Sequence, residues 1–197
     1  MSDVRLPELP APLRWAPQPE HWSLDGRALT IGAGAVTDLF LDPQGAPPKL
    51  NAPRLLGRVN GDFQLSARVK VGFRSTFDAG VLLLWVGEDA WAKLCFERSP
   101  DGRPLVVSVV TRGVSDDANG FAVEGDRVWL RVSRLAPSYA FHASTDGRSW
   151  ELVRHFALDG EPAVGFLAQS PTGEGCRVTF DELRFSAERL ADLRSGA

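Results

Sequence analysis

The sequence predicts an all-β sandwich of antiparallel sheets, and two observations support this prediction. Apolar and polar residues alternate along much of the chain, most regularly over residues 63–73, and a period of two places one face of a strand in a core. Pairs such as Asn60-Gly61 and Asp146-Gly147 separate the alternating runs. These pairs tolerate the positive φ of tight turns, so we expect the runs to be joined as hairpins.

The first quarter of the chain contributes more loop than strand. Residues 7–19 are rich in proline and are expected to form a surface arm that is not a separate domain. Residues 42–48 contain three prolines and a glycine. This composition predicts a loop, which we place over one end of the sandwich.

The middle of the chain carries the clearest strands. Residues 81–86 read VLLLWV and are apolar at every position, which is typical of a central strand covered on both faces. Residues 127–133 and 139–144 alternate again and predict two half-buried strands.

A change of parity marks the last predicted strand. Val178 and Phe180 are apolar at even positions, whereas Leu183 and Phe185 are apolar at odd positions. A β-bulge near residues 181–182 restores both pairs to the core, because a bulge inserts one extra residue into one strand.

A length of 197 residues suits one large all-β domain, and no linker or internal repeat divides the chain. We therefore expect a single domain over residues 1–197, with its core at about 13–186. The tail, residues 186–197, is expected to form one short helix or a frayed end.

Composition disfavours several classes of protein. The net charge is −3 and the 22 Lys and Arg residues are scattered, which argues against a nucleic-acid partner. The longest strongly apolar run, residues 81–86, is too short to cross a bilayer, and the N-terminus lacks a signal-peptide core. We therefore expect a cytoplasmic protein with no membrane partner.

The cysteines and histidines give no sign of a metal or a cofactor. Cys95 and Cys176 lie far apart and are expected to be reduced, buried thiols, with a disulfide between them as the alternative. The three histidines occur in unrelated segments, and no phosphate-binding glycine loop or dinucleotide fingerprint is present. No metal and no cofactor are expected.

Residues 91–97 form the most informative stretch. In a strand, alternate side chains share a face, so Trp91, Lys93 and Glu97 point one way. Leu94 and Phe96 point to the opposite, apolar face. An aromatic ring, a cation and an anion on one wall are suited to a small polar ligand. The alternative is a solvated face whose charges serve only solubility.

A second polar stretch follows at residues 108–117. If its strand pairs with residues 91–97, Arg112 lies within reach of Trp91 and can hold a carboxylate or two hydroxyls. Asp116 and Asp117 lie in an acidic turn, but the EF-hand spacing is absent. An ordinary Asx-rich turn is therefore favoured over a calcium loop.

Two aspartates interrupt apolar runs. Asp38 stands between Thr37 and Leu39, and Asp78 precedes the strongly apolar strand. An unpaired buried carboxylate is costly. Each aspartate is therefore exposed at an edge, paired with a cation or part of a site, and a structural salt bridge is the common outcome.

These motifs resemble a known family. The matching residues are Trp91-x-Lys93-x-Cys95-x-Glu97, residues 108–112, Ser115-Asp116 and residues 139–150. Their order and spacing resemble the concanavalin A-like domains of unknown function that include the fungal regulation-of-enolase protein, over residues 13–186. The resemblance implies a jelly roll of two curved antiparallel sheets with a sugar-binding concave face. Such domains often carry a tryptophan where this chain has Phe40. They often carry an aromatic residue where this chain has Asp117.

By motif position, the resemblance places most of the candidate ligand-binding residues on that concave face. Phe40 and Asp78 complete the set. The candidates are Asp38, Phe40, Asp78, Trp91, Lys93, Glu97, Thr111, Arg112, Ser115 and Asp116.

We expect a lectin-like domain that binds a saccharide or another small polyhydroxylated molecule without chemistry. A glycoside hydrolase is one alternative, and it needs a second carboxylate about 5–5.5 Å or 6.5–9.5 Å from the first. Asp38, Asp78 or Asp116 can supply that partner to Glu97, but the Glu-x-Asp-x-Glu strand of sandwich-fold glucanases is absent. The other alternative is a regulatory domain that binds a protein partner.

Overall fold

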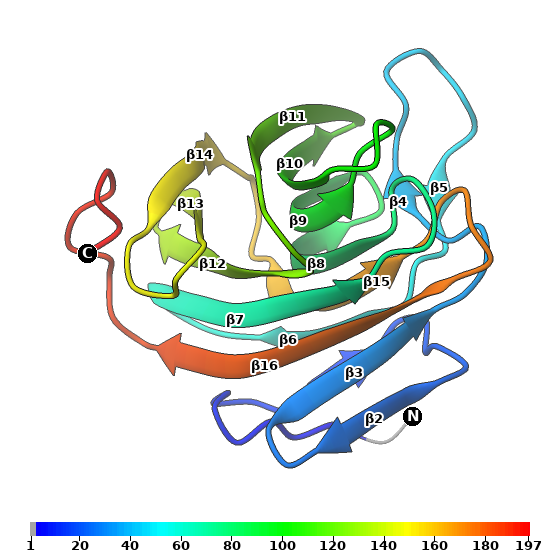
Figure 1. Ribbon diagram of the computed structural model, residues 1–197. Helices are drawn as coiled ribbons and strands as arrows, with labels where there is room; N and C mark the ends of the chain where they lie inside the picture. The colour runs from blue at the N-terminus through cyan, green and yellow to red at the C-terminus, as the bar shows by residue number, and fades with distance from the viewer. Residues whose placement is uncertain (1–2) are drawn as a thin grey trace.

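The computed structural model describes residues 3–197 and shows two seven-stranded antiparallel sheets packed face to face (Figure 1). Sheet 1 contains, in spatial order, β1 (Arg14–Trp15), β6 (Arg54–Arg58), β15 (Ala163–Gln169), β8 (Ala79–Gly87), β9 (Ala90–Arg98), β10 (Pro104–Arg112) and β11 (Val114–Ala122). Sheet 2 contains β14 (Glu151–Ala157), β13 (Ser138–Ser144), β12 (Arg127–Leu135), β7 (Phe63–Gly72), β16 (Cys176–Ser186), β3 (Ala28–Ala33) and β2 (Trp22–Asp25).

The predicted all-β jelly-roll sandwich is therefore confirmed. A small third sheet joins β4 (Leu39–Phe40) to β5 (Lys49–Leu50). The loop predicted at residues 42–48 forms the tip of this β4–β5 hairpin, which stands beside sheet 1 (Figure 1). Residues 3–197 contain no helix that is long and apolar enough to cross a membrane.

The core lies between the inner faces of the two sheets, where alternation places it. On β7, Leu65 and Val69 are fully buried while Lys70 is exposed. Strand β8 is buried on both sides: Leu82 packs into the main core, and Leu83 packs into a second apolar cluster on the outer face of sheet 1. The prediction of a central strand covered twice is confirmed.

The predicted bulge is also present. The pairing of β16 with β7 shifts register between Asp181 and Arg184, and Glu182 adopts a positive φ of 47°. Both Phe180 and Leu183 consequently face the core, where each is buried.

Both chain ends are more integrated than predicted. Leu9, Leu13 and Trp15 of the proline-rich arm are buried in the main core, so the arm is not merely a surface feature. Residues 187–197 form turns rather than a helix, and Leu190 is buried against sheet 2. The tail is neither helical nor frayed, because its leucines cover apolar positions on that sheet.

Candidate functional site

The side chains of β9 alternate as its sequence predicts. Lys93 and Glu97 point to the outer face of sheet 1, beside the β4–β5 hairpin, and Leu94 and Phe96 lie in the main core. Strand β9 pairs with β8 on one side and β10 on the other. It therefore presents its polar residues in the middle of a broad sheet.

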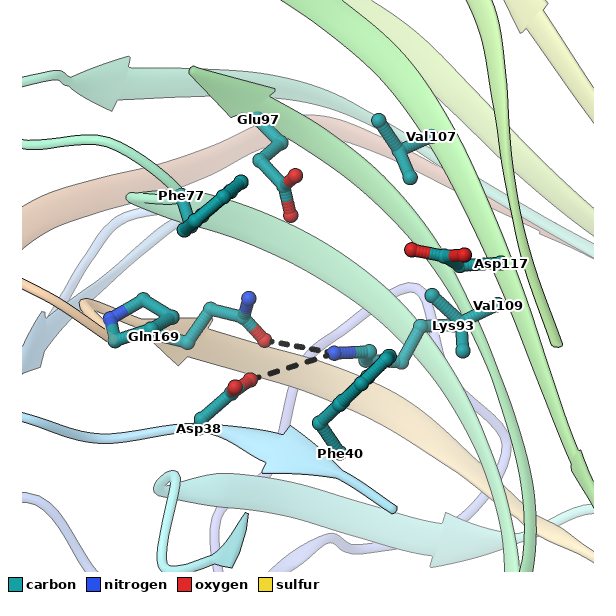
Figure 2. Close-up of a pocket in the computed structure, with 10 residues that line it drawn as sticks. Asp38, Phe40, Phe77, Lys93, Glu97, Val107, Val109, Asp117 and Gln169 are labelled. Carbon is teal, nitrogen blue, oxygen red and sulfur yellow. Dashed lines mark hydrogen bonds and ion pairs between the residues drawn. The ribbon is translucent and has the colours of Figure 1, made fainter. Parts of the chain in front are cut away.

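A pocket with a cavity volume of about 170 Å³ opens at this position. Strands β4, β9, β10 and β11, the loop before β8 and the end of β15 contribute side chains to it (Figure 2). The lining residues are Asp38, Phe40, Phe77, Lys93, Glu97, Val107, Val109, Asp117, Gln169 and Pro171.

Lys93 occupies the centre of this pocket, with only 2% of its side chain exposed. Its Nζ donates a hydrogen bond to Gln169 Oε1 at 3.0 Å and lies 3.6 Å from Asp38 Oδ1. A buried ammonium requires such partners, because leaving water is costly. An ammonium carries three protons, so one proton remains for a water molecule or a ligand.

Glu97 points into the same pocket from the end of β9 (Figure 2). Burial raises the pKa of its carboxyl group to about 7; the Lys93 ammonium opposes this change, and the carboxylates of Asp38 and Asp117 reinforce it. Near neutral pH, Glu97 can therefore either donate or accept a hydrogen bond. This balance suits a group that contacts hydroxyls.

Two phenylalanines provide apolar surface at the pocket. Phe40 extends from β4, and Phe77 precedes β8 with 37% of its surface exposed. Phe77 has a positive φ of 67°, which is uncommon for a bulky residue and often marks a functional position. Val107, Val109 and Pro171 complete the apolar lining.

Four of the candidate residues thus converge: Asp38, Phe40, Lys93 and Glu97 all line the pocket. The position of Trp91 differs from the expectation. Trp91 has the predicted parity but is fully buried in the second cluster, with its ring centroid 5.5 Å from Lys93 Nζ. It supports the lysine and offers no stacking face to a ligand.

Three other candidates have structural partners instead of a place in the pocket. Asp78 is fully buried, accepts a hydrogen bond from Ser170 Oγ at 2.6 Å and braces the loop before β8. Thr111 and Ser115 share a buried hydrogen bond of 2.9 Å. Ser115 Oγ also accepts a hydrogen bond from the Leu41 amide, so it holds the chain leaving β4.

Arg112 and Asp116 point away from the pocket. Arg112 lies at the Trp91 end of the sheet, as predicted, but its guanidinium donates to the Ala157 carbonyl of β14. Asp116 pairs with Arg154 at 3.0 Å. Within residues 3–197, no group of three His, Cys, Asp or Glu residues is placed to hold a metal ion.

Six residues of the pocket were not among the candidates, and three of them, Phe77, Asp117 and Gln169, are the most informative. Phe77 lies in a turn and Gln169 ends β15, whereas Asp117 was expected in an acidic turn and as a replacement for an aromatic residue. Alternation could have placed Asp117 at the pocket: Asp117 pairs across the strands with Val109, and Val109 pairs with Lys93, so the three side chains share one face. No local pattern points to Phe77 or Gln169.

Fold and site together define a jelly-roll sandwich with a small pocket on the outer face of one sheet, where charged side chains lie between apolar walls. The chain belongs to the family described as "Protein of unknown function (DUF1349)", whose model matches residues 15–188. No functionally curated protein matches the sequence significantly.

Solved structures share the fold. A functionally unknown protein from Saccharomyces cerevisiae aligns with a TM-score of 0.82 at 24% identity, covering 89% of this chain and 96% of that one. A mutant GH43 protein from Bacillus licheniformis aligns with a TM-score of 0.73 at 16% identity over 89% of this chain and 37% of its own. A xylan β-1,4-xylosidase from Bacillus halodurans aligns with a TM-score of 0.67 at 14% identity, over 84% and 34%. This chain spans about a third of the length of those two proteins.

Proposed function

We propose that this chain is a lectin-like binding domain whose pocket holds one sugar-sized, polyhydroxylated molecule. The observation that carries the proposal is the convergence of Lys93, Glu97 and Asp38 beside two phenylalanine rings in one cavity. Small-ligand sites combine apolar walls with a few polar groups that fix orientation in this way.

The size of the cavity restricts the ligand. An engineered cavity of roughly 150 Å³ holds benzene, and the pocket here measures about 170 Å³. A single six-membered ring therefore fits, whereas an oligosaccharide must extend beyond the pocket. The expected ligand is a monosaccharide, the end of a longer glycan or a cyclic polyol.

The polar groups match such a ligand. The carboxylates of Asp38, Asp117 and Glu97 accept hydrogen bonds from hydroxyls, and Lys93 can donate its remaining proton to a ring or hydroxyl oxygen. Phe40 and Phe77 can pack against the apolar face of a sugar ring. Both kinds of contact are needed because hydroxyls alone bind water equally well.

The relatives support a sugar ligand at the level of the fold. One matched structure is called a xylan β-1,4-xylosidase. The likeness to the fungal regulation-of-enolase group remains a prediction that the matches leave untested. Cytoplasmic location is also a proposal, supported by the two free, buried thiols Cys95 and Cys176.

Calorimetric titration with a panel of pentoses, hexoses and cyclic polyols tests the proposal. We expect saturable binding that weakens at least about tenfold in Glu97→Gln, since one charge-assisted hydrogen bond contributes about 1.5–3 kcal/mol. Asp116→Asn is the matched control, because Asp116 lies outside the pocket, and it should bind like the parent. Absence of binding across the panel would overturn the proposal.

The same samples address the enzymatic alternative. Incubation with aryl glycosides should give no product if the domain only binds. Release of the aryl group by the parent, abolished in Glu97→Gln and retained in Asp116→Asn, would establish catalysis instead.

A further inference from the structure

A second polar cavity lies on the outer face of sheet 2, on the other side of the sandwich. Arg131 of β12 pairs in register with Ser66 of β7, and Ser66 pairs with Arg184 of β16. Adjacent strands lie about 4.8 Å apart, so the α-carbons of the two arginines are roughly 10 Å apart. Two guanidinium groups therefore flank one serine hydroxyl across three neighbouring strands.

Arg131 is buried without a carboxylate partner. Only 7% of its surface is exposed. Its Nη2 donates to the Gly196 carbonyl at 2.6 Å, and the guanidinium stacks on Trp150 at 4.2 Å. Its Nε has no hydrogen-bond partner in residues 3–197. Burial, with no neighbouring anion to oppose it, lowers the pKa of Arg131 to about 10.

The next row on the same face shows how an arginine is neutralised in this sheet. Arg68 of β7 lies 2.8 Å from Asp181 and 2.6 Å from Glu182. Its charge is therefore matched by the protein itself. An uncompensated buried cation is costly. The contrast with Arg68 therefore indicates that the charge of Arg131 is balanced by an anion that residues 3–197 do not supply.

The cavity beside Arg131 contains about 330 Å³, and its lining includes Ser66, Gln64 and Arg184 but no carboxylate. Arg184 is exposed and makes no ion pair or side-chain hydrogen bond with any described residue. Two guanidiniums and a hydroxyl form a donor-rich cradle, and guanidinium geometry suits the paired oxygens of a tetrahedral anion.

We infer that this cavity binds a compact oxyanion, the phosphate group of inorganic phosphate or of a small phosphate ester, between Arg131 and Arg184. The site stands apart from the pocket on sheet 1, since no residue lines both cavities. Its existence does not depend on the proposed sugar binding.

Titration of the full chain with inorganic phosphate, at an ionic strength held constant with sodium chloride, tests the inference. We expect saturable binding and a dose-dependent rise in Tm. Arg184→Gln should weaken phosphate binding at least about tenfold, since it removes a charge-assisted hydrogen bond. Its side chain is exposed, so this variant should fold normally.

Arg177→Gln is the matched control, because Arg177 is an exposed arginine on the same strand outside the cavity. It should bind phosphate as the parent does. A parallel titration with glycerol phosphate distinguishes the source: tighter binding than phosphate indicates an ester ligand, and weaker binding indicates the free anion. No saturable response to either probe, or equal weakening in both arginine variants, would overturn the inference.

Discussion

The two cavities on the outer faces of the sheets carry opposite charge, although the same alternation produces both faces. On sheet 1, the pocket gathers three carboxylates around the single ammonium of Lys93. On sheet 2, Arg131 and Arg184 line a cavity that contains no carboxylate. The inner faces are mainly apolar because they form one core. The core thus defines the fold, and the outward positions remain free to differ in chemistry.

The largest effect is expected from removing the ammonium of Lys93, the single cation among the described residues that line the pocket on sheet 1. Lys93→Ala should lower the free energy of unfolding by about 3 kcal/mol, because it leaves a cavity and an unpaired carboxylate at Asp38. Urea denaturation measures this loss. Lys70→Ala is the control: Lys70 is half exposed and its partner Asp126 is similarly open, so a change below about 0.5 kcal/mol is expected. Equal losses in both variants would contradict the buried role of Lys93.

The second prediction concerns pH. The pKa of Glu97 is raised from 4.5 to about 7, so between these values the folded state holds a proton that the unfolded state has lost. Stability therefore falls as pH rises through this range. Glu97→Gln should raise the free energy of unfolding by about 2 kcal/mol at pH 8.5, the full shift being reduced for partial exposure.

Thermal or urea unfolding at two pH values checks this expectation. At about pH 4.5 both folded proteins carry an uncharged side chain at this position, and the unfolded parent is only half ionised, so their stabilities should agree within about 0.5 kcal/mol. A stabilisation that is the same at both pH values would show that the substitution acts through packing and not through ionisation.

The smallest expected changes in stability are those of two arginine variants on the outer face of sheet 2. Arg68→Gln should cost about 1 kcal/mol, because it leaves Asp181 and Glu182 without their cation. Arg184→Gln should change stability by less than about 0.5 kcal/mol in the absence of anions, since it breaks no contact. Denaturant midpoints compared in phosphate-free buffer measure both. A larger cost for Arg184 would reveal a structural role that its free side chain does not show.

The sequence predicted the framework better than the site. Alternation correctly placed Lys93 and Glu97 on one face and Leu94 in the core, and the parity change at residues 178–185 located the bulge. Period-two patterns are local properties of a strand, so they are readable without a structure.

The remaining features depend on contacts between distant segments. Trp91 has the predicted parity, yet it lies in an apolar cluster with Leu39 of the β4–β5 hairpin, and no local pattern reveals such packing. Gln169 reaches Lys93 from a strand 76 residues away. Arg112 lies outside the pocket for a different reason. The register places it at the predicted end of the sheet, but the alternation along β10 turns its side chain to the face opposite the pocket.

One consequence follows from the position of Cys95, between Lys93 and Glu97 on β9. Its thiol is fully buried in the same apolar cluster as Leu39, and burial raises its pKa far above the ordinary value. A thiol-specific reagent can reach this sulfur only during transient local opening. The rate at which a thiol reagent modifies Cys95 therefore measures how often the apolar cluster beneath the pocket opens to solvent.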